Sequence, residues 1–282
     1  MELYFQITRR LSKVQKIVDV YCFYFHGSLF LLMTFDSGFR VYQKNNRLPI
    51  ISSGDSTLDE LLEGGFRKNL VYLLYGDKKK TTNILLTTAV ISQKAFVNGG
   101  MGDGIGVAFI DGNNRFNPYN VSKYAVSQKL SPTKVLENIV IARAFTWDQM
   151  IELLENRLAK LEHVKVVMVS GITTLFQSYE KQTFEDLLRA IDGIKKILER
   201  TKPLIILTAP LNEHSLFRPK GGKILSHFGN VLVMINDNER YVEYILVQHP
   251  FLPENRLLKW KPREPKRKLS NPTKNTTIDC WF

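Results

Sequence analysis

The sequence predicts an α/β protein in which a mostly parallel sheet carries helices on both faces. Short apolar runs alternate with helical patterns from about residue 50 to residue 250. The run from Val164 to Val169 is almost entirely apolar, which is typical of a parallel strand buried on both faces. The helical patterns lie between successive strand patterns, and this order requires crossover connections between parallel strands.

The helices are predicted from caps and from apolar spacing. A capping-box signal over 55–60 predicts a short helix that stops at Gly64. A longer helix is expected over 81–97, closed by the glycine pair 99–100. Apolar residues at helical spacing predict further helices over 147–161 and 184–198.

The strands are predicted from apolar runs that are bounded by turn residues. They are expected over 70–75, 105–110, 139–142, 164–169, 204–207, 231–235 and 242–247. The last two are joined by the polar segment 236–239, which is typical of an antiparallel hairpin. In such sheets, ligands bind at the carboxyl ends of the strands.

Two segments flank this core. Residues 1–48 are rich in aromatic and β-favouring residues, with breaks at 26–28 and 36–38, so a small β-rich segment is expected there. A basic tail is expected over 257–282. The predicted core domain therefore occupies 49–256.

The chain is strongly basic. It has 39 lysines and arginines against 27 acidic residues, a net charge of +12, and a pI near 9.6. Such an excess favours polyanionic partners, including nucleic acid, through counterion release. Cys22 and Cys280 lie far apart without a metal-binding cluster, which argues against a disulfide framework or a zinc site. The apolar stretch 17–35 is interrupted at 26–28, which predicts a hairpin rather than a membrane span.

One turn has the context of a phosphate-binding loop. Gly76 follows a predicted strand and is separated from the next helix by polar residues. Lysines beside a helix N-terminus favour an anion, although a solvated cationic turn or direct contact with DNA phosphates would also explain them. The candidate nucleotide-binding residues are Gly76, Lys78, Lys79, Lys80, Thr81 and Thr82.

Several segments carry a family resemblance, in a consistent order. The most specific is SPTKVLENIVIARAF, from Ser131 to Phe145; the others are Ile51–Phe66, Phe109–Pro118, Gly221–Asn230 and His249–Glu254. These segments resemble the RecA/RadA recombinase family, most closely archaeal RadA and its eukaryotic relatives. The resemblance covers roughly residues 50–256 and implies a RecA-like P-loop NTPase core.

The resemblance also implies where the phosphate-binding loop must place its chemistry. Counted from Gly76, the second glycine, the lysine and the Ser/Thr of the motif fall at Thr81, Thr82 and Asn83. If Lys80 and Thr81 are taken as the Lys-Thr pair instead, the loop is two residues too short and has no second glycine. The loop is therefore a degenerate Walker A motif in either alignment.

Three further family positions lack the expected side chain. The water-activating glutamate falls at Asn113, the Walker B acid at Ser170, and the nucleotide-sensing glutamine at Pro210. Asp111 matches a structural aspartate of the family rather than a metal partner. The resemblance thus predicts a pseudo-ATPase with no catalytic residue, no metal and no cofactor.

DNA contacts are predicted in two places. The resemblance places DNA-binding loops after Phe176 and between Asn212 and Lys220; both are shortened, and Arg218 and Lys220 are donors in the second. Between Glu254 and Lys274, eight basic and two acidic residues leave a net charge of +6. A flexible basic segment with an aromatic residue can bind phosphates and unpaired bases, while the alternative is a solubilising tail. The candidate contacts there are Arg256, Lys259, Trp260, Lys261, Arg263, Lys266, Arg267 and Lys268.

Charge and resemblance together favour a recombination mediator. It would be a RadA paralogue that binds DNA, single-stranded DNA in particular, and assists a RadA-type recombinase or another paralogue in recombination or repair. The alternative, favoured by the shortened loops, is a RecA-fold scaffold or regulator that does not bind DNA. The segment before Pro49 also lacks the family's helical DNA-binding domain and polymerisation motif. A slow ATPase is the least favoured hypothesis. A homo-oligomer is compatible with the resemblance, and the expected location is the cytoplasm beside the nucleoid, or the nucleus in a eukaryote.

Overall fold

The computed structural model describes residues 49–176, 181–212 and 214–262, together with Ser37. The chain divides into two compact units, Met1–Arg47 and Leu48–Phe282. The β-rich segment expected over 1–48 lies outside the described residues except for Ser37. All the elements described below belong to the second unit.

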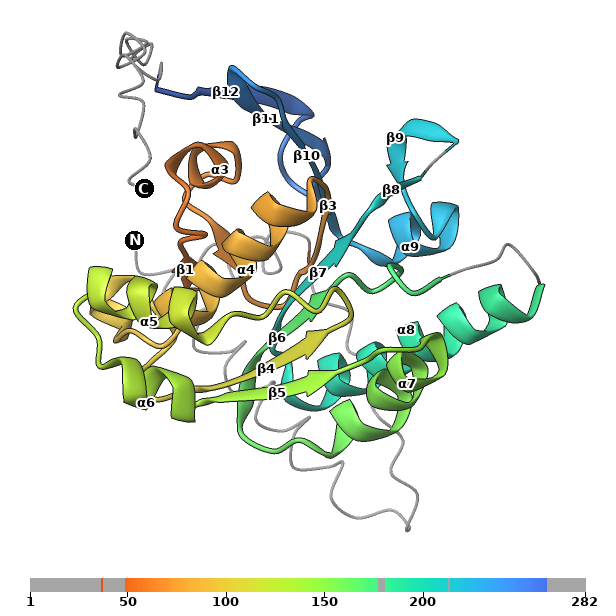
Figure 1. Cartoon of the computed structure of the whole chain (residues 1–282), viewed down its shortest axis with the longest axis horizontal. Coiled ribbons are helices and arrows are strands. Elements are labelled where there is room, and N and C mark those ends of the chain that lie inside the picture. Colours follow the sequence, from red (N-terminus) through yellow and green to blue (C-terminus); the bar gives the residue numbers. More distant parts are fainter. Residues whose placement is uncertain (1–36, 38–48, 177–180, 213, 263–282) are drawn as a thin grey trace, which may run out of the picture. The chain divides into compact units, whose positions relative to one another are not determined.

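An eight-stranded sheet forms the centre of this unit (Figure 1). Its strand order is β12-β11-β10-β3-β7-β6-β4-β5, and every neighbouring pair from β10 to β5 is parallel. The strands are β3 (Val71–Gly76), β4 (Gly106–Asp111), β5 (Ile139–Arg143), β6 (Val164–Ser170), β7 (Leu204–Ala209), β10 (Val231–Asp237), β11 (Tyr241–Gln248) and β12 (Asn255–Trp260). The predicted fold class is confirmed.

Helices cover both faces of the sheet. The first face packs against α3 (Ser56–Leu61), α4 (Lys78–Ile91), α5 (Pro118–Ser127) and α6 (Pro132–Glu137). The second packs against α7 (Trp147–Glu152), α8 (Lys181–Thr201) and α9 (Gly222–Phe228). Between α7 and β6 the chain forms a π-helical turn, Leu153–Arg157, and a 3-10 turn, Leu158–Lys160; a further 3-10 turn is Phe96–Asn98.

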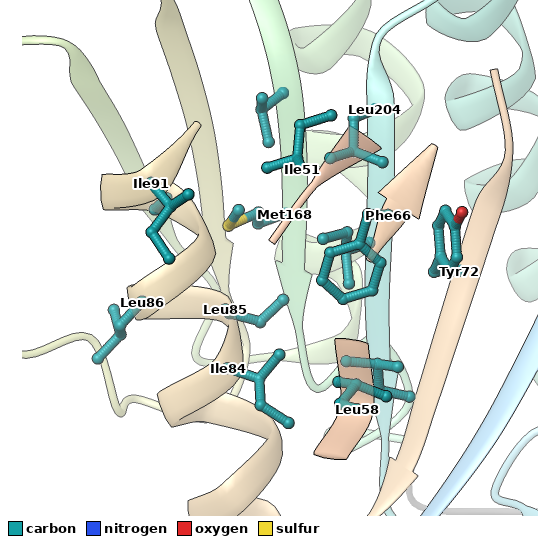
Figure 2. Close-up of a cluster of buried hydrophobic side chains, with 14 of the residues drawn as sticks. Ile51, Leu58, Phe66, Tyr72, Ile84, Leu85, Leu86, Ile91, Met168 and Leu204 are labelled. Atoms are coloured by element: carbon teal, nitrogen blue, oxygen red, sulfur yellow. The ribbon is translucent and has the colours of Figure 1, made fainter. Parts of the chain in front are cut away.

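Side chains alternate between the two faces of the sheet along each strand and so contribute to two hydrophobic cores. On β3, Tyr72 and Leu74 point to the first face, whereas Leu73 and Tyr75 point to the second, and all four are fully buried. Figure 2 shows the first core, where Ile84 and Leu85 of α4 pack beside the sheet. Two short ribbons complete the unit: β1 (Ile50–Ile51) pairs with β2 (Phe66–Arg67), and β8 (Leu211–Asn212) pairs with β9 (Ser215–Pro219).

The predicted bounds of α4 are wrong at both ends. The helix begins at Lys78 instead of Thr81, because Asp77 caps it, and ends at Ile91 instead of Val97. After Ser92 the chain folds back, with the Met101 amide donating to the Ser92 carbonyl oxygen. Lys78, Lys79 and Lys80 therefore form the first turn of a helix rather than a loop.

The predicted basic tail begins too early. Residues 255–260 form β12, which pairs antiparallel with β11 along its whole length. Arg256, Lys259 and Trp260 thus occupy an edge strand of the sheet rather than a flexible segment. Within the described part of the chain, no helix is both long and apolar enough to cross a bilayer.

Candidate functional site

Two adjoining cavities lie where the parallel strands end. The larger, of about 700 Å³, is lined by Gly76, Asp77, Lys78, Lys79, Arg115, Leu211, Ile235, Asn236, Asp237, Asn238 and Glu243. The smaller, of about 350 Å³, is lined by Lys79, Thr82, Asn83, Leu86, Asn114, Arg115, Phe116, Asn117 and Asn120. Both include Lys79 and Arg115, so the cavities share a cationic wall at the start of α4. Ligands of open α/β sheets bind at this edge.

The connection from β3 to α4 is a single residue, Asp77. Its carboxylate accepts a hydrogen bond from the Lys80 amide at 2.7 Å, so the protein's own anion caps the N-terminus of the helix. The backbone of Gly76 is pressed against β10: a Cβ added to it would lie 2.1 Å from the Ile235 carbonyl oxygen. This tight connection leaves no loop that could wrap a phosphate group.

The two threonines of the predicted phosphate-binding turn donate hydrogen bonds to the backbone of α4. Thr81 donates from Oγ1 to the Asp77 carbonyl oxygen at 2.8 Å, and Thr82 donates to the Lys78 carbonyl oxygen at 2.7 Å. Both side chains are buried. Their hydroxyl groups therefore serve the backbone of α4, in the pattern usual for threonine inside a helix.

The predicted cations differ in what surrounds them. Lys78 and Lys79 are exposed on the cavity wall, and Lys80 is half-buried. In the described part of the chain, no ion pair involves Lys78, Lys79 or Arg115. The acidic wall of the same cavity is paired instead, because Asp237 contacts Lys261 and Glu243 contacts Arg256. The cavity therefore carries three cations without a described ion pair, beside the Asp77 carboxylate at the start of α4.

Asn113 and Ser170 contact each other. Asn113 donates from Nδ2 to the Ser170 Oγ at 3.2 Å, and its Oδ1 accepts from Thr174 at 2.5 Å. These neutral side chains form hydrogen bonds with one another at the ends of β4 and β6. Beside them, the Gly171 amide donates to the Thr208 hydroxyl. An amide cannot accept a proton from water at neutral pH, so this cluster has no general base.

Asp111 supports the turn that follows β4. It is completely buried, and it accepts hydrogen bonds from the amides of Asn113, Arg115 and Phe116 at 2.9–3.2 Å. Arg143 lies 3.9 Å away on β5. The structure thus gives Asp111 the structural role that was predicted from the resemblance.

The second predicted DNA loop is a short hairpin, β8–β9. It begins after Pro210, whose carbonyl oxygen accepts from the Lys220 amide at 2.8 Å. Tyr75 donates from its hydroxyl to the Phe217 carbonyl oxygen at 3.1 Å, while the Phe217 side chain is exposed. Arg218 is exposed beside it, and Lys220 is half-buried. The first predicted loop, 177–180, lies outside the described residues.

The cations of β12, and Lys261 just after it, are paired with carboxylates. Lys259 pairs with Asp55 at 2.8 Å, Lys261 pairs with Asp237 at 2.5 Å, and Arg256 pairs with Glu243. Trp260 is exposed. The remaining predicted contacts, Arg263, Lys266, Arg267 and Lys268, lie outside the described residues.

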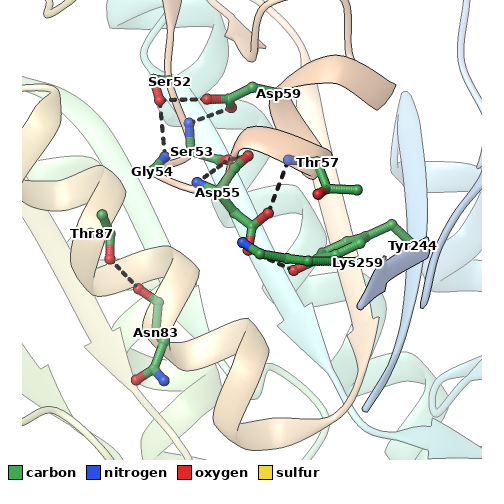
Figure 3. A network of polar contacts seen from close by, with 10 residues as sticks. All are labelled: Ser52, Ser53, Gly54, Asp55, Thr57, Asp59, Asn83, Thr87, Tyr244 and Lys259. Carbon is green, nitrogen blue, oxygen red and sulfur yellow. Dashed lines mark hydrogen bonds and ion pairs between the residues drawn. The ribbon is translucent and has the colours of Figure 1, made fainter. Parts of the chain in front are cut away.

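Figure 3 shows the network around Asp55, which the sequence identifies only as a helix cap. Its carboxylate accepts from the Thr57 amide, from the Tyr244 hydroxyl and from Lys259. Burial raises the pKa of Asp55, but the hydrogen bonds from Lys259 and Tyr244 outweigh it and hold the pKa below its usual value. The pairing with Lys259 spans most of the chain, so no local pattern could have revealed it.

The chain matches the family model described as Rad51 over residues 44–186, about half of its length. The chain belongs to the Rad51 family.

Three curated relatives extend the similarity of this Rad51-family chain. It is 28% identical over 208 residues to the DNA repair and recombination protein RadA of Cenarchaeum symbiosum, covering 68% of this chain and 52% of that protein. It is 24% identical over 262 residues to the DNA repair protein RAD51 homolog 1 of Arabidopsis thaliana, covering 86% and 74%. It is 25% identical over 242 residues to the meiotic recombination protein DMC1 homolog B of Oryza sativa subsp. japonica, covering 79% and 68%. The chain spans about half the length of the archaeal relative.

Proposed function

We propose that this Rad51-family chain is a non-catalytic paralogue that acts in DNA recombination or repair. It binds DNA, single-stranded DNA more tightly than duplex, and assists an active recombinase or another paralogue without hydrolysing ATP. The relatives are named as DNA repair and recombination proteins, which supports the process. The neutral side chains at the family's acidic positions, and the short β3–α4 connection, support the non-catalytic role.

The observation that carries the proposal is the Asp77 cap. A P-loop surrounds the β-phosphate with backbone amides at a helix N-terminus and adds a lysine and a hydroxyl. Here the connection is one residue long, the Asp77 carboxylate occupies the N-terminus of α4, and both nearby hydroxyls bond to the helix. A nucleotide phosphate in this place would meet a like charge.

Water activation is also unsupported by the side chains present. The Asn113–Ser170 pair is neutral and closed by hydrogen bonds. Phosphoryl transfer depends on a positioned nucleophile and on neutralised phosphate charge.

DNA binding is supported by cations that form no ion pair with any residue the structure describes. Lys78, Lys79 and Arg115 border the larger cavity, and Arg218 is exposed on the β8–β9 hairpin. The chain as a whole has a net charge of +12. Contacts of this kind bind phosphates without reading sequence, and their affinity falls steeply with salt.

The test of the non-catalytic role is ATP turnover by the purified chain, with and without single-stranded DNA, measured beside an active recombinase. We expect phosphate release at the background rate, and binding of single-stranded DNA that is unchanged by ATP and Mg²⁺. ATP-dependent DNA binding, or turnover that the Asp77→Ala variant alters, would overturn the proposal.

A second candidate is an interaction scaffold that does not bind DNA. Two observations favour it: the cations of β12 are paired with carboxylates, and the edge strand β5 exposes Val140 and Ile141. An apolar edge strand is a template for pairing with another chain. Binding to a recombinase without any affinity for DNA at low salt would favour this candidate.

A further inference from the structure

One face of the β11–β12 ribbon is exposed at the end that carries Leu258 and Trp260. Cross-strand partners in an antiparallel pair lie on the same face, so Tyr241 and Trp260 form one side together with Glu243 and Leu258. The opposite side holds Val242 and Lys259, and Figure 3 shows Lys259 reaching toward the start of α3. The first side therefore faces away from α3, and Trp260 and Leu258 on it are 68% and 39% exposed.

Trp260 and Tyr241 form an aromatic pair at this end of the face. Their ring centroids are 5.4 Å apart and the rings are inclined at 66°. Neither ring belongs to the two main hydrophobic cores. An exposed tryptophan held by an aromatic neighbour presents a flat apolar surface at a fixed place, which suits stacking on a planar ligand.

Three ion pairs fix the strand that carries this surface. Lys259–Asp55 joins β12 to α3, Lys261–Asp237 joins its end to β10, and Arg256–Glu243 joins its start to β11. These cations are thereby used inside the protein. Of the predicted contacts on β12, only Trp260 presents a large apolar surface to solvent.

Cations lie near the aromatic pair. Glu243, on the same face, is buried and paired with Arg256, and it also lines the larger cavity, whose wall carries Lys78, Lys79 and Arg115. Arg240, next to Tyr241, is exposed, and its carbonyl oxygen accepts from the Lys261 amide. A ligand that combines aromatic faces with regular negative charge matches this surface.

We infer that the outer face of β11–β12 is a stacking platform for unpaired bases of single-stranded DNA, with Trp260 and Tyr241 as its base-binding residues. This inference rests on the DNA binding proposed above and adds a place and a strand preference to it. Base–aromatic stacking tolerates any sequence because every base has a π-face, and duplex DNA cannot use it because its bases are already stacked.

The experiment measures binding of the full-length chain to an oligothymidylate and to a duplex of equal length across a salt series. Trp260→Ala should weaken oligothymidylate binding roughly tenfold, with an unchanged slope against salt, because a stacked base releases no counterions. Duplex binding should be unaffected. Trp260→Phe should retain most of the affinity. Phe96→Ala is the matched control, because Phe96 is 65% exposed and lies outside the strand-end surface.

Each outcome has a separate meaning. If the wild-type chain binds no DNA at low salt, the proposed function itself fails. If it binds and Trp260→Ala matches Phe96→Ala, DNA binding stands and the stacking platform is wrong. If Trp260→Ala keeps its DNA affinity but loses binding to a recombinase, the face docks a protein and the inference is overturned. Circular dichroism of each variant establishes that the fold is retained.

Discussion

Asp55 combines the roles of helix cap and ion-pair partner in one side chain. As the cap of α3 it accepts from the Thr57 amide, and as a charge it holds Lys259 and the Tyr244 hydroxyl. Burial raises the pKa of Tyr244 above its usual range, and the neighbouring Asp55 carboxylate raises it further, so the phenol stays a donor. One carboxylate therefore joins three elements of the chain.

Asp55→Ala should lower the free energy of unfolding by about 3 kcal/mol, since it removes a helix cap, leaves the buried Tyr244 hydroxyl without an acceptor and breaks the ion pair with Lys259. Asp55→Asn should cost only about 1 kcal/mol, because asparagine also caps helices but carries no charge for Lys259. Urea unfolding of the two variants separates these contributions. Equal losses in both variants would mean that the ion pair alone matters.

His249 is a second residue whose environment has a measurable consequence. Its Nδ1 accepts from the amides of Phe251 and Leu252 at 3.1 and 3.0 Å, so the ring must stay neutral. Burial, with Arg67 nearby, lowers its pKa to about 4 from the usual 6.5. The unfolded chain therefore binds a proton between these values that the folded chain does not bind.

The free energy of unfolding should therefore fall with pH: the stability due to a neutral His249 is fully present above pH 6.5 and is lost as the pH falls toward 4. Because the ring is partly exposed, solvent screening reduces the effect to about 1 kcal/mol. His249→Asn keeps an acceptor at the same place and does not titrate. Urea unfolding at pH 7 and pH 5 should show a smaller loss in the variant; an equal loss would assign the pH dependence to other groups.

At the scale of elements, the buried strands could be predicted from the sequence because continuous apolar runs encode them directly. The runs beginning at Val164 and Leu204 became β6 and β7 with all but one residue buried. The start of α4 was missed because three consecutive lysines were interpreted as a turn, although Asp77 ahead of them is an ordinary cap signal. β12 was missed because Arg256, Lys259 and the adjacent Lys261 find their carboxylates on β11, at the cap of α3 and on β10.

The same element, the β3–α4 connection, yields a prediction about catalysis. Restoring the family's acids with Asn113→Glu and Ser170→Asp should not restore ATP turnover, because the single-residue connection still lacks a phosphate cradle. Ser170 is completely buried, so the new carboxylate should also destabilise the fold. Phosphate release by the folded double variant is the measurement. Turnover above background would show that the connection is not the limiting defect.

At the scale of the whole molecule, the positive charge has two parts with different roles. Arg256, Lys259 and Lys261 anchor β12, so they contribute to the fold and little to long-range attraction. Residues 263–282 contain five basic and two acidic residues, a net charge of +3 out of the chain's +12. Removing residues 263–282 tests the contribution of their charge to DNA binding and leaves the ion pairs of β12 in place.

The cut belongs after Pro262, since a cut before Asn255 would delete β12 and its three ion pairs. The shortened chain should keep its thermal midpoint, and the DNA binding proposed above should stay independent of ATP. Its affinity for single-stranded DNA should fall, and the slope of log K against log salt should become shallower by about three, because fewer counterions are released. Trp260 remains in this variant, so a further loss on adding Trp260→Ala measures stacking separately. An unchanged salt slope would instead assign the electrostatic contacts to the core, where Lys78, Lys79, Arg115 and Arg218 are the exposed cations to substitute next.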